Sequence, residues 1–135
     1  MELLKQSPTM NLPAEWFTGD AHADVIYRGD APSRMRANMV RFTPGARTAW
    51  HSHALGQTLH IVEGIALVQS RGGNIVEAHS SDLIHTPPGE EHWHGAAPDQ
   101  FMVHLALWET DDATWLEHVS DDDYNGRRVS TRTRP

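Results

Sequence analysis

The sequence of 135 residues contains no cysteine. This absence excludes a disulfide framework, a thiolate metal site and a cysteine nucleophile, and it fits a reducing compartment. No apolar run approaches the roughly 18 residues that cross a membrane. Residues 1–16 lack the basic region and the continuous apolar core of a signal peptide. We therefore expect a cytoplasmic protein without a membrane partner.

Positive charge is also scarce. The sequence has 11 lysine and arginine residues against 18 aspartate and glutamate residues, a formal net charge of −7. Nucleic-acid-binding domains carry a basic face, so this balance argues against nucleic acid as a partner. Residues 127–135 contain arginine but no acid and show no apolar period. We expect them to form a disordered basic tail, the alternative being a contact with the acidic body or with a partner. Residues 1–126 are then a single domain.

Glycine and proline recur at short intervals and separate segments of strand length. Such short runs with regular turn signals indicate an all-β sandwich or barrel. Residues 113–124 are the only segment with room for much helix. Within it, Ser120 followed by Asp123 resembles a capping box for a final helical turn. Residues 115–119 fit a last strand equally well. The predicted strands are 24–27, 35–42, 48–53, 57–63, 65–71, 74–79, 83–86, 92–97 and 102–109.

Histidine is the residue that this sequence has in excess. Ten histidines are present, and most of them lie between His51 and His104. In a strand the side chains alternate between the two faces, so His51 and His53 point to one face. Gln57 joins them if the turn at 54–56 starts a new strand in phase, and His92 follows the turn at 87–89. These four side chains can close around one divalent metal ion.

A carboxamide at position 57 changes the chemistry that such a metal supports. Three neutral imidazoles and a neutral amide leave a divalent ion with its full charge of +2. The site is therefore expected to bind metal less tightly than a version with glutamate, but to be a stronger Lewis acid. It also disfavours a trivalent state, which argues against redox cycling. Nitrogen and oxygen ligands fit Mn²⁺, Fe²⁺, Co²⁺, Ni²⁺ or Zn²⁺, and ligand type alone does not choose among them.

Two further histidines are candidates for acid–base catalysis. His94 has the parity of His92 and can line the same cavity, although a hydrogen-bonded wall residue is an equal interpretation. His104 lies within the apolar segment 101–108, where a lone histidine is often a structural core residue; beside a metal cavity we favour a catalytic role. His60 has the opposite parity to Gln57 and should point away from the metal. Arg47 is expected to be a solvated turn residue.

Two spaced motifs resemble those of the cupin superfamily. The first motif of that family is usually written G-x5-H-x-H-x3,4-E-x6-G, and the second G-x5-P-x-G-x2-H-x3-N. This chain presents Gly45, His51, His53, Gln57 and Gly64 for the first, and Ser81, Pro87, Gly89, His92 and Ala96 for the second. The spacing is kept throughout. The departures are Gln57 for Glu, Ser81 for Gly and Ala96 for Asn, and only the first alters the metal ligands.

More closely, residues 15–19, 44–51, 55–59 and 92–98 resemble small bacterial cupins that include manganese-dependent hydroxynitrile lyases. The resemblance implies a single cupin (jelly-roll) β-barrel, a homodimer or higher homo-oligomer, and Mn²⁺ held by His51, His53, Gln57 and His92. It also implies a histidine near the substrate, at His104. The activity expected from it is cleavage or formation of a small-molecule cyanohydrin, with the metal as a Lewis acid and His104, or else His94, as general base.

Two other functions remain open from the sequence. A cupin dioxygenase or isomerase could use the same metal site, although the missing carboxylate counts against the oxygen route. A non-catalytic cupin would bind metal and a small molecule without turnover. Tryptophans border such a cavity or pack in the core, and we favour core packing for Trp50, Trp93 and Trp108. Trp16 and Phe17 form an apolar pair that must be buried, either in this chain or in a dimer.

Overall fold

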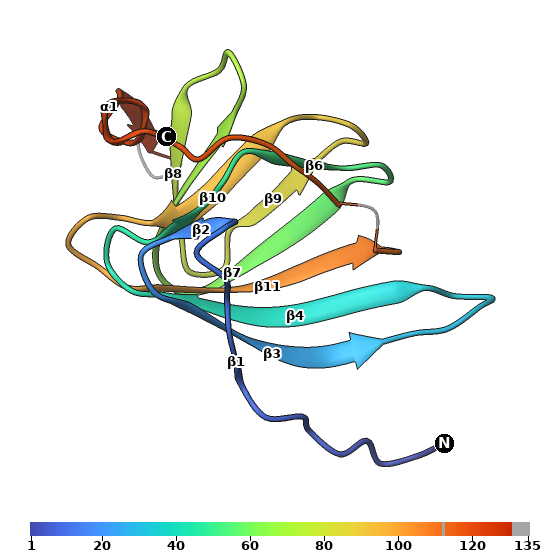
Figure 1. The fold of residues 1–135 in the computed structure, drawn as a ribbon. Helices are drawn as coiled ribbons and strands as arrows, with labels where there is room; N and C mark the ends of the chain where they lie inside the picture. Colours follow the sequence, from blue (N-terminus) through green and yellow to red (C-terminus); the bar gives the residue numbers. More distant parts are fainter. Residues whose placement is uncertain (112, 131–135) are drawn as a thin grey trace.

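The computed structural model describes residues 1–111 and 113–130 and is almost entirely β-structure, as the sequence predicts (Figure 1). Its single helix in the described residues is α1, and the strands cover most of the segments expected from the turn signals. The elements are β1 (Met10–Asn11), β2 (Phe17–Thr18), β3 (Ala21–Arg28), β4 (Met35–Phe42), β5 (Arg47–Thr48), β6 (His51–His53), β7 (Gln57–Ser70), β8 (Ile75–His79), β9 (Leu83–Thr86), β10 (His92–Ala96), β11 (Met102–Glu109), β12 (Ala113–Trp115), α1 (Asp121–Tyr124) and β13 (Arg128–Ser130).

The strands form one curled sheet whose two halves share β7. One half has the order β1-β3-β4-β11-β7-β9, and all of its pairs are antiparallel. In the other half, β7 pairs with β8 and β10, and β10 also pairs with β5 and β6. Figure 1 shows β3, β4 and β11 side by side across one layer, with β6 and β10 in the other. This is the jelly-roll barrel that the motifs implied.

A bend at Gly64 lets β7 serve both halves. The sequence indicated two strands, 57–63 and 65–71, but the chain runs continuously from Gln57 to Ser70. Gly64 has a φ of 79°, and a Cβ atom there would lie 1.8 Å from the carbonyl oxygen of Phe101. Only glycine fits this left-handed position against a neighbouring backbone. The breaker therefore bends a strand instead of ending one.

Alternation along the strands separates a filled interior from the outer surface. One cluster of buried side chains in the interior of the barrel includes Phe42 of β4, Leu59 and Ile61 of β7, and Met102 of β11. A second cluster packs Trp50 and Trp93 against the C-terminal segment. Core packing is therefore confirmed for these two tryptophans. Among the described residues, no helix is long and apolar enough to cross a membrane.

The C-terminal segment is fixed to the barrel by a buried arginine. Ser120 accepts a hydrogen bond from the Asp123 N–H at 3.1 Å, so the predicted cap of α1 is confirmed. The expectation of a solvated Arg47 is wrong, because its side chain is 6% exposed. Its guanidinium donates to the carbonyl oxygen of Val119 at 2.9 Å and lies over the Tyr124 ring at 4.4 Å. A buried cation needs such acceptors, and the chain folds back to supply them.

The basic tail is partly a strand. Arg128–Ser130 form β13, which pairs in parallel with β8. Arg128 also approaches Glu77 at 3.9 Å, a contact with the acidic body of the kind left as the alternative. Residues 128–130 are therefore ordered, unlike the disordered tail that we expected. A segment without an apolar period can still form a strand, because its backbone supplies the hydrogen bonds. Residues 131–135 lie outside the described residues.

Candidate metal centre

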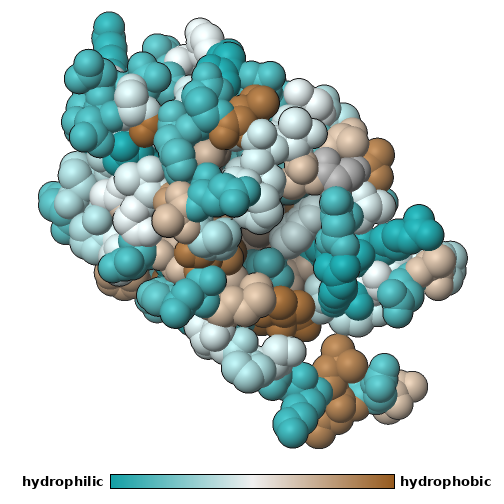
Figure 2. Space-filling model, viewed as in Figure 1, coloured by the Kyte–Doolittle hydropathy of each residue, from teal (hydrophilic) through white to brown (hydrophobic). Residues whose placement is uncertain are grey.

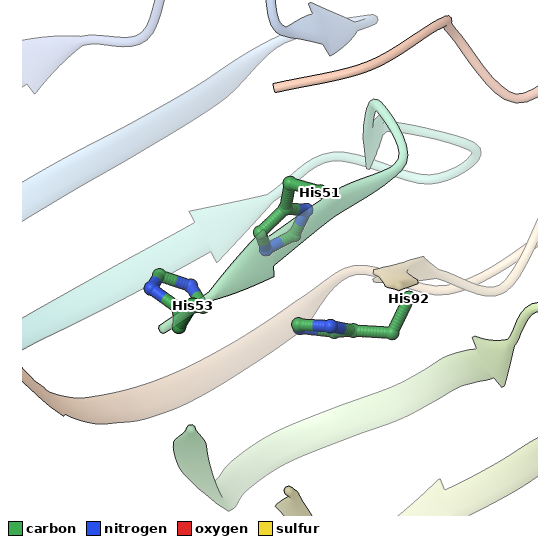
Figure 3. Close-up of side chains that lie close together, drawn as sticks. All are labelled: His51, His53 and His92. Carbon is green, nitrogen blue, oxygen red and sulfur yellow. The ribbon is translucent and has the colours of Figure 1, made fainter. Parts of the chain in front are cut away.

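Three histidines come together from two paired strands. His51 and His53 lie on β6, and His92 opens β10 directly opposite His51. The side chains of all three are buried and point toward one another (Figure 3). Each offers one nitrogen, and these atoms lie within 4.8 Å of one another. The structure thus brings together the three imidazoles that the sequence selected.

Backbone carbonyl groups set which nitrogen of two imidazoles faces the centre. The Nδ1–H groups of His51 and His92 donate to the carbonyl oxygens of Ala49 and Glu90, at 2.9 and 3.1 Å. A carbonyl oxygen can only accept, so each Nε2 atom keeps its lone pair for the interior. Burial lowers the pKa of His51 well below its usual value and also lowers the pKa of His92. Both rings are therefore held in the neutral form that binds metal.

Gln57 begins β7 and reaches the same centre. Its Oε1 atom lies 3.0 Å from Nε2 of His92. Because the N–H of the His92 ring is used at Nδ1, two lone pairs face each other across this distance. Two ligand atoms about 2.1 Å from a metal and at right angles to each other also lie about 3.0 Å apart. The donor set therefore fits a divalent cation, which would relieve the repulsion between the two lone pairs.

A second pair of imidazoles adjoins the cluster. His104 Nε2 and His94 Nδ1 lie 2.9 Å apart, and both rings are buried. Burial lowers the pKa of His104 to about 4 and that of His94 well below its usual value, so the pair is neutral at pH 7. The His94 ring centroid lies 5.2 Å from that of His51, whereas the nearest ring contacts of His104 are His94 at 4.7 Å and Phe42 at 5.3 Å. His94 is thus the nearer of the two to the candidate ligands.

This pair can accept a proton at one end and donate one at the other. The outer nitrogens, Nε2 of His94 and Nδ1 of His104, have no hydrogen-bond partner among the described residues. When both rings are neutral and one donates to the other, one outer nitrogen carries a hydrogen and the other carries a lone pair. The two tautomers exchange these roles. At the cavity wall the pair can therefore accept a proton at one nitrogen and donate one at the other.

The cluster opens into a cavity of about 580 Å³ with mostly apolar and aromatic walls. Trp115 stacks on the His51 ring with centroids 4.6 Å apart, and Trp16 stacks on Trp115 at 5.0 Å. Trp108 lines the cavity as well and, partly buried, also packs against the core cluster, as expected for it. The sequence did not single out Trp115, because it lies opposite His51 only through the pairing of β12 with β6.

An ion-pair cluster borders the cavity at Asp111, which is one of its lining residues. Asp111 contacts the guanidinium groups of Arg28 and Arg36, and the Arg36 side chain is buried. The hydrogen bonds from these arginines lower the pKa of Asp111 to about 2. Sequence reasoning missed this cluster, since its members come from three separate strand ends.

Comparison with known proteins gives the same picture. The cupin domain family matches residues 38–108. The chain is 46% identical over 115 residues to an (R)-mandelonitrile lyase from Granulicella tundricola, covering 83% of this chain and 88% of that one. A cupin-like protein from Thermotoga maritima has 31% identity and a TM-score of 0.81, covering 92% and 95% of the two chains. A polyketide cyclase from Streptomyces resistomycificus shares the fold, with a TM-score of 0.68, 18% identity, and coverage of 92% and 90%.

Proposed function

The chain belongs to the cupin family, and we propose that it is a metal-dependent lyase that cleaves or forms cyanohydrins. The observation that carries the proposal is the neutral donor set beside a neutral imidazole pair. In the described residues, the cluster of candidate ligands contains three histidines and no acidic side chain. The 46% identity to a mandelonitrile lyase supports the same reaction class.

We assign the metal to His51, His53, Gln57 and His92. A divalent ion held there would act as a Lewis acid that makes a substrate hydroxyl group more acidic. We propose Mn²⁺ as the native ion, as the resemblance to manganese-dependent relatives implies. The four donors carry no charge, so the protein does not offset the positive charge of the ion. The low pKa values of His51 and His92 keep both rings ready to bind it.

The imidazole pair moves the proton. Whichever of His94 and His104 presents its lone pair to the cavity accepts the hydroxyl proton of the cyanohydrin. The bond between the hydroxyl-bearing carbon and the nitrile carbon then breaks, giving a carbonyl compound and cyanide. The imidazolium returns the proton to cyanide, so one cyanohydrin yields one carbonyl compound and one hydrogen cyanide. Help of this kind is worth about 10²–10⁴-fold in rate.

The direct experiment is mandelonitrile cleavage by metal-stripped protein reloaded separately with Mn²⁺, Fe²⁺, Zn²⁺ and Ni²⁺. Benzaldehyde release is followed by its absorbance. We expect turnover with Mn²⁺, and none from the His92→Ala variant, which also loses the metal. Absence of benzaldehyde with every metal would overturn the proposed activity.

We also propose a homodimer. Residues 1–9 extend away from the barrel (Figure 1), and Figure 2 shows hydrophobic residues within this projecting segment. Leu3 is fully exposed and Leu4 is about half exposed, and contact with a second copy would remove this apolar surface from water. Light scattering after size-exclusion chromatography should give a dimer mass, and a smaller mass when Leu3 and Leu4 are replaced by serine. A monomer mass for the unaltered chain would contradict this assembly.

A further inference from the structure

An asparagine interrupts the apolar wall of the cavity. Along β4, Phe42, Val40 and Asn38 line the cavity, and Arg36, the next residue of the same parity, is buried and pairs with Asp111. Asn38 is half-buried and pairs with Val25 on one side and Ala106 on the other. A hydrophobic residue would be expected at such a position if the wall only had to contact a hydrocarbon ring.

The carboxamide of Asn38 is uncommitted, whereas each of the other amide and hydroxyl side chains in the wall lies within 3.2 Å of a polar group. Asn11 pairs with His22 at 2.8 Å, Thr48 accepts the His94 backbone N–H at 3.2 Å, and Gln57 faces His92. Within residues 1–111 and 113–130, the Asn38 side chain has no hydrogen-bond partner. A polar group in an apolar wall is unfavourable until something satisfies it. The group that satisfies Asn38 must therefore come from solvent or from a ligand.

The register of the sheet places Asn38 one step from the imidazole pair toward the Arg36–Asp111 ion pair. On β11, His104 lies opposite Val40 and Ala106 lies opposite Asn38. Diagonal neighbours on one face of a sheet lie about 7–8 Å apart, so this is the scale of the separation between Asn38 and His104. The small side chain of Ala106 leaves the space between them open. A substrate whose hydroxyl group meets the imidazole pair would extend over Ala106 to Asn38.

We propose that Asn38 is a substrate-binding residue that selects aromatic cyanohydrins carrying a hydroxyl group on the ring. Tryptophan and phenylalanine side chains line the cavity and suit an aromatic ring. A ring hydroxyl can accept from Nδ2 and donate to Oδ1 of Asn38, satisfying both atoms of the carboxamide. The cavity of about 580 Å³ lies within the usual range of roughly 300–1,000 Å³ for small-molecule sites, so it admits a substituted ring. This inference rests on the proposed lyase function and names its substrate class.

The test compares mandelonitrile with its 3-hydroxy and 4-hydroxy derivatives, using Mn²⁺-loaded protein. We expect kcat/KM for the better hydroxylated substrate to exceed that for mandelonitrile by on the order of tenfold, the usual worth of a hydrogen bond in a partly buried site. Asn38→Leu, which keeps the side-chain volume, should abolish this preference, so that the ratio of kcat/KM for the hydroxylated substrate to kcat/KM for mandelonitrile falls to about one. Asn11→Leu is the matched control, since Asn11 lines the same cavity but is bonded to His22; it should keep the preference.

Binding of the aldehyde products gives a readout that does not need turnover. Calorimetry with hydroxybenzaldehydes and benzaldehyde should show about tenfold tighter binding of a hydroxylated product to the unaltered protein, and equal binding to Asn38→Leu. If Asn38→Leu does not fold, Asn38→Ala is measured in the same way. Loss of binding preference in the variant without any lyase activity would support Asn38 and overturn the proposed function. Lyase activity with no ring-hydroxyl preference, or an equal loss for all substrates in the variant, would overturn the role of Asn38 alone.

Discussion

Gln57 Oε1 and His92 Nε2 face each other at 3.0 Å, and both atoms present lone pairs. The orientation follows from the His92 ring, whose Nδ1–H is committed to the Glu90 carbonyl oxygen. A cation between the two atoms would interact favourably with both lone pairs. This relationship supports the proposal that Gln57 is a metal ligand, and its lack of charge can be tested directly.

Replacing Gln57 with glutamate should strengthen metal binding and weaken catalysis. The added negative charge attracts the cation, and we expect an affinity gain of about tenfold or more, each tenfold being about 1.4 kcal/mol. The same charge lowers the Lewis acidity of the ion, so kcat should fall. Competition with a chelator measures the affinity, and mandelonitrile cleavage measures kcat. A Gln57→Glu variant with higher kcat would contradict the Lewis-acid argument.

Removing the His104 imidazole should separate proton transfer from metal binding. His104→Ala is expected to lower turnover by about 10²–10⁴-fold. The pair then loses Nδ1 of His104, which is one of its two outer nitrogens that exchange protons with the substrate. Metal content should stay near that of the unaltered protein, since the ring of His104 contacts His94 and Phe42. Elemental analysis beside the activity assay checks both values. Parallel losses of metal and activity would show that His104 supports the ligands and does not act in proton transfer.

The stacking of Trp115 on His51 should contribute to metal affinity. Groups that orient a metal ligand typically alter affinity or activity by about 10–100-fold, and we expect Trp115→Leu to lie at the low end because the His51 hydrogen bond to Ala49 remains. Trp16 stacks on the far side of Trp115, so Trp16→Leu leaves the contact between Trp115 and His51 in place. The metal affinity of the Trp16→Leu variant should therefore be unchanged. Titration with Mn²⁺ decides between them. Equal affinities in the two variants would remove any role for the stack at the ligand.

Acidification should unfold the metal-free protein through its buried histidines. The pKa of His104 is about 4 in the folded protein, against an ordinary value of 6.5. Above pH 6.5 neither state is protonated and stability is complete. As the pH falls from 6.5 to about 4, His104 binds a proton in the unfolded chain but not in the folded protein. The free energy of unfolding therefore falls across this window by on the order of 3 kcal/mol. Denaturant unfolding at several pH values should show a shallower loss for His104→Gln, which cannot be protonated; identical curves would contradict this account.

Much of the fold could be read from the sequence because turns and alternation are local properties. The segment 35–42 and the segment 102–109 are β4 and β11 with the predicted bounds. Gly64 was misread as the end of a strand. A glycine in the left-handed region occurs both in turns and in bent strands, and only the neighbouring backbone of Phe101 distinguishes the two. Arg47 was misread as solvated because its acceptors, including the carbonyl of Val119, lie far along the chain.

The sequence by itself determined the candidate ligands, because His51 and His53 share a strand face and the second motif carries His92. It also determined the charge of the donor set, since a carboxamide at Gln57 is neutral wherever it points. Only the tertiary structure decided which imidazoles pair, that Trp115 covers His51, and that Asn38 faces the cavity beside Ala106. These contacts join strands far apart in sequence, and their register depends on the bend of β7 and on packing across the barrel. Local pattern carries no information about that register, so it could not predict which residues line the cavity.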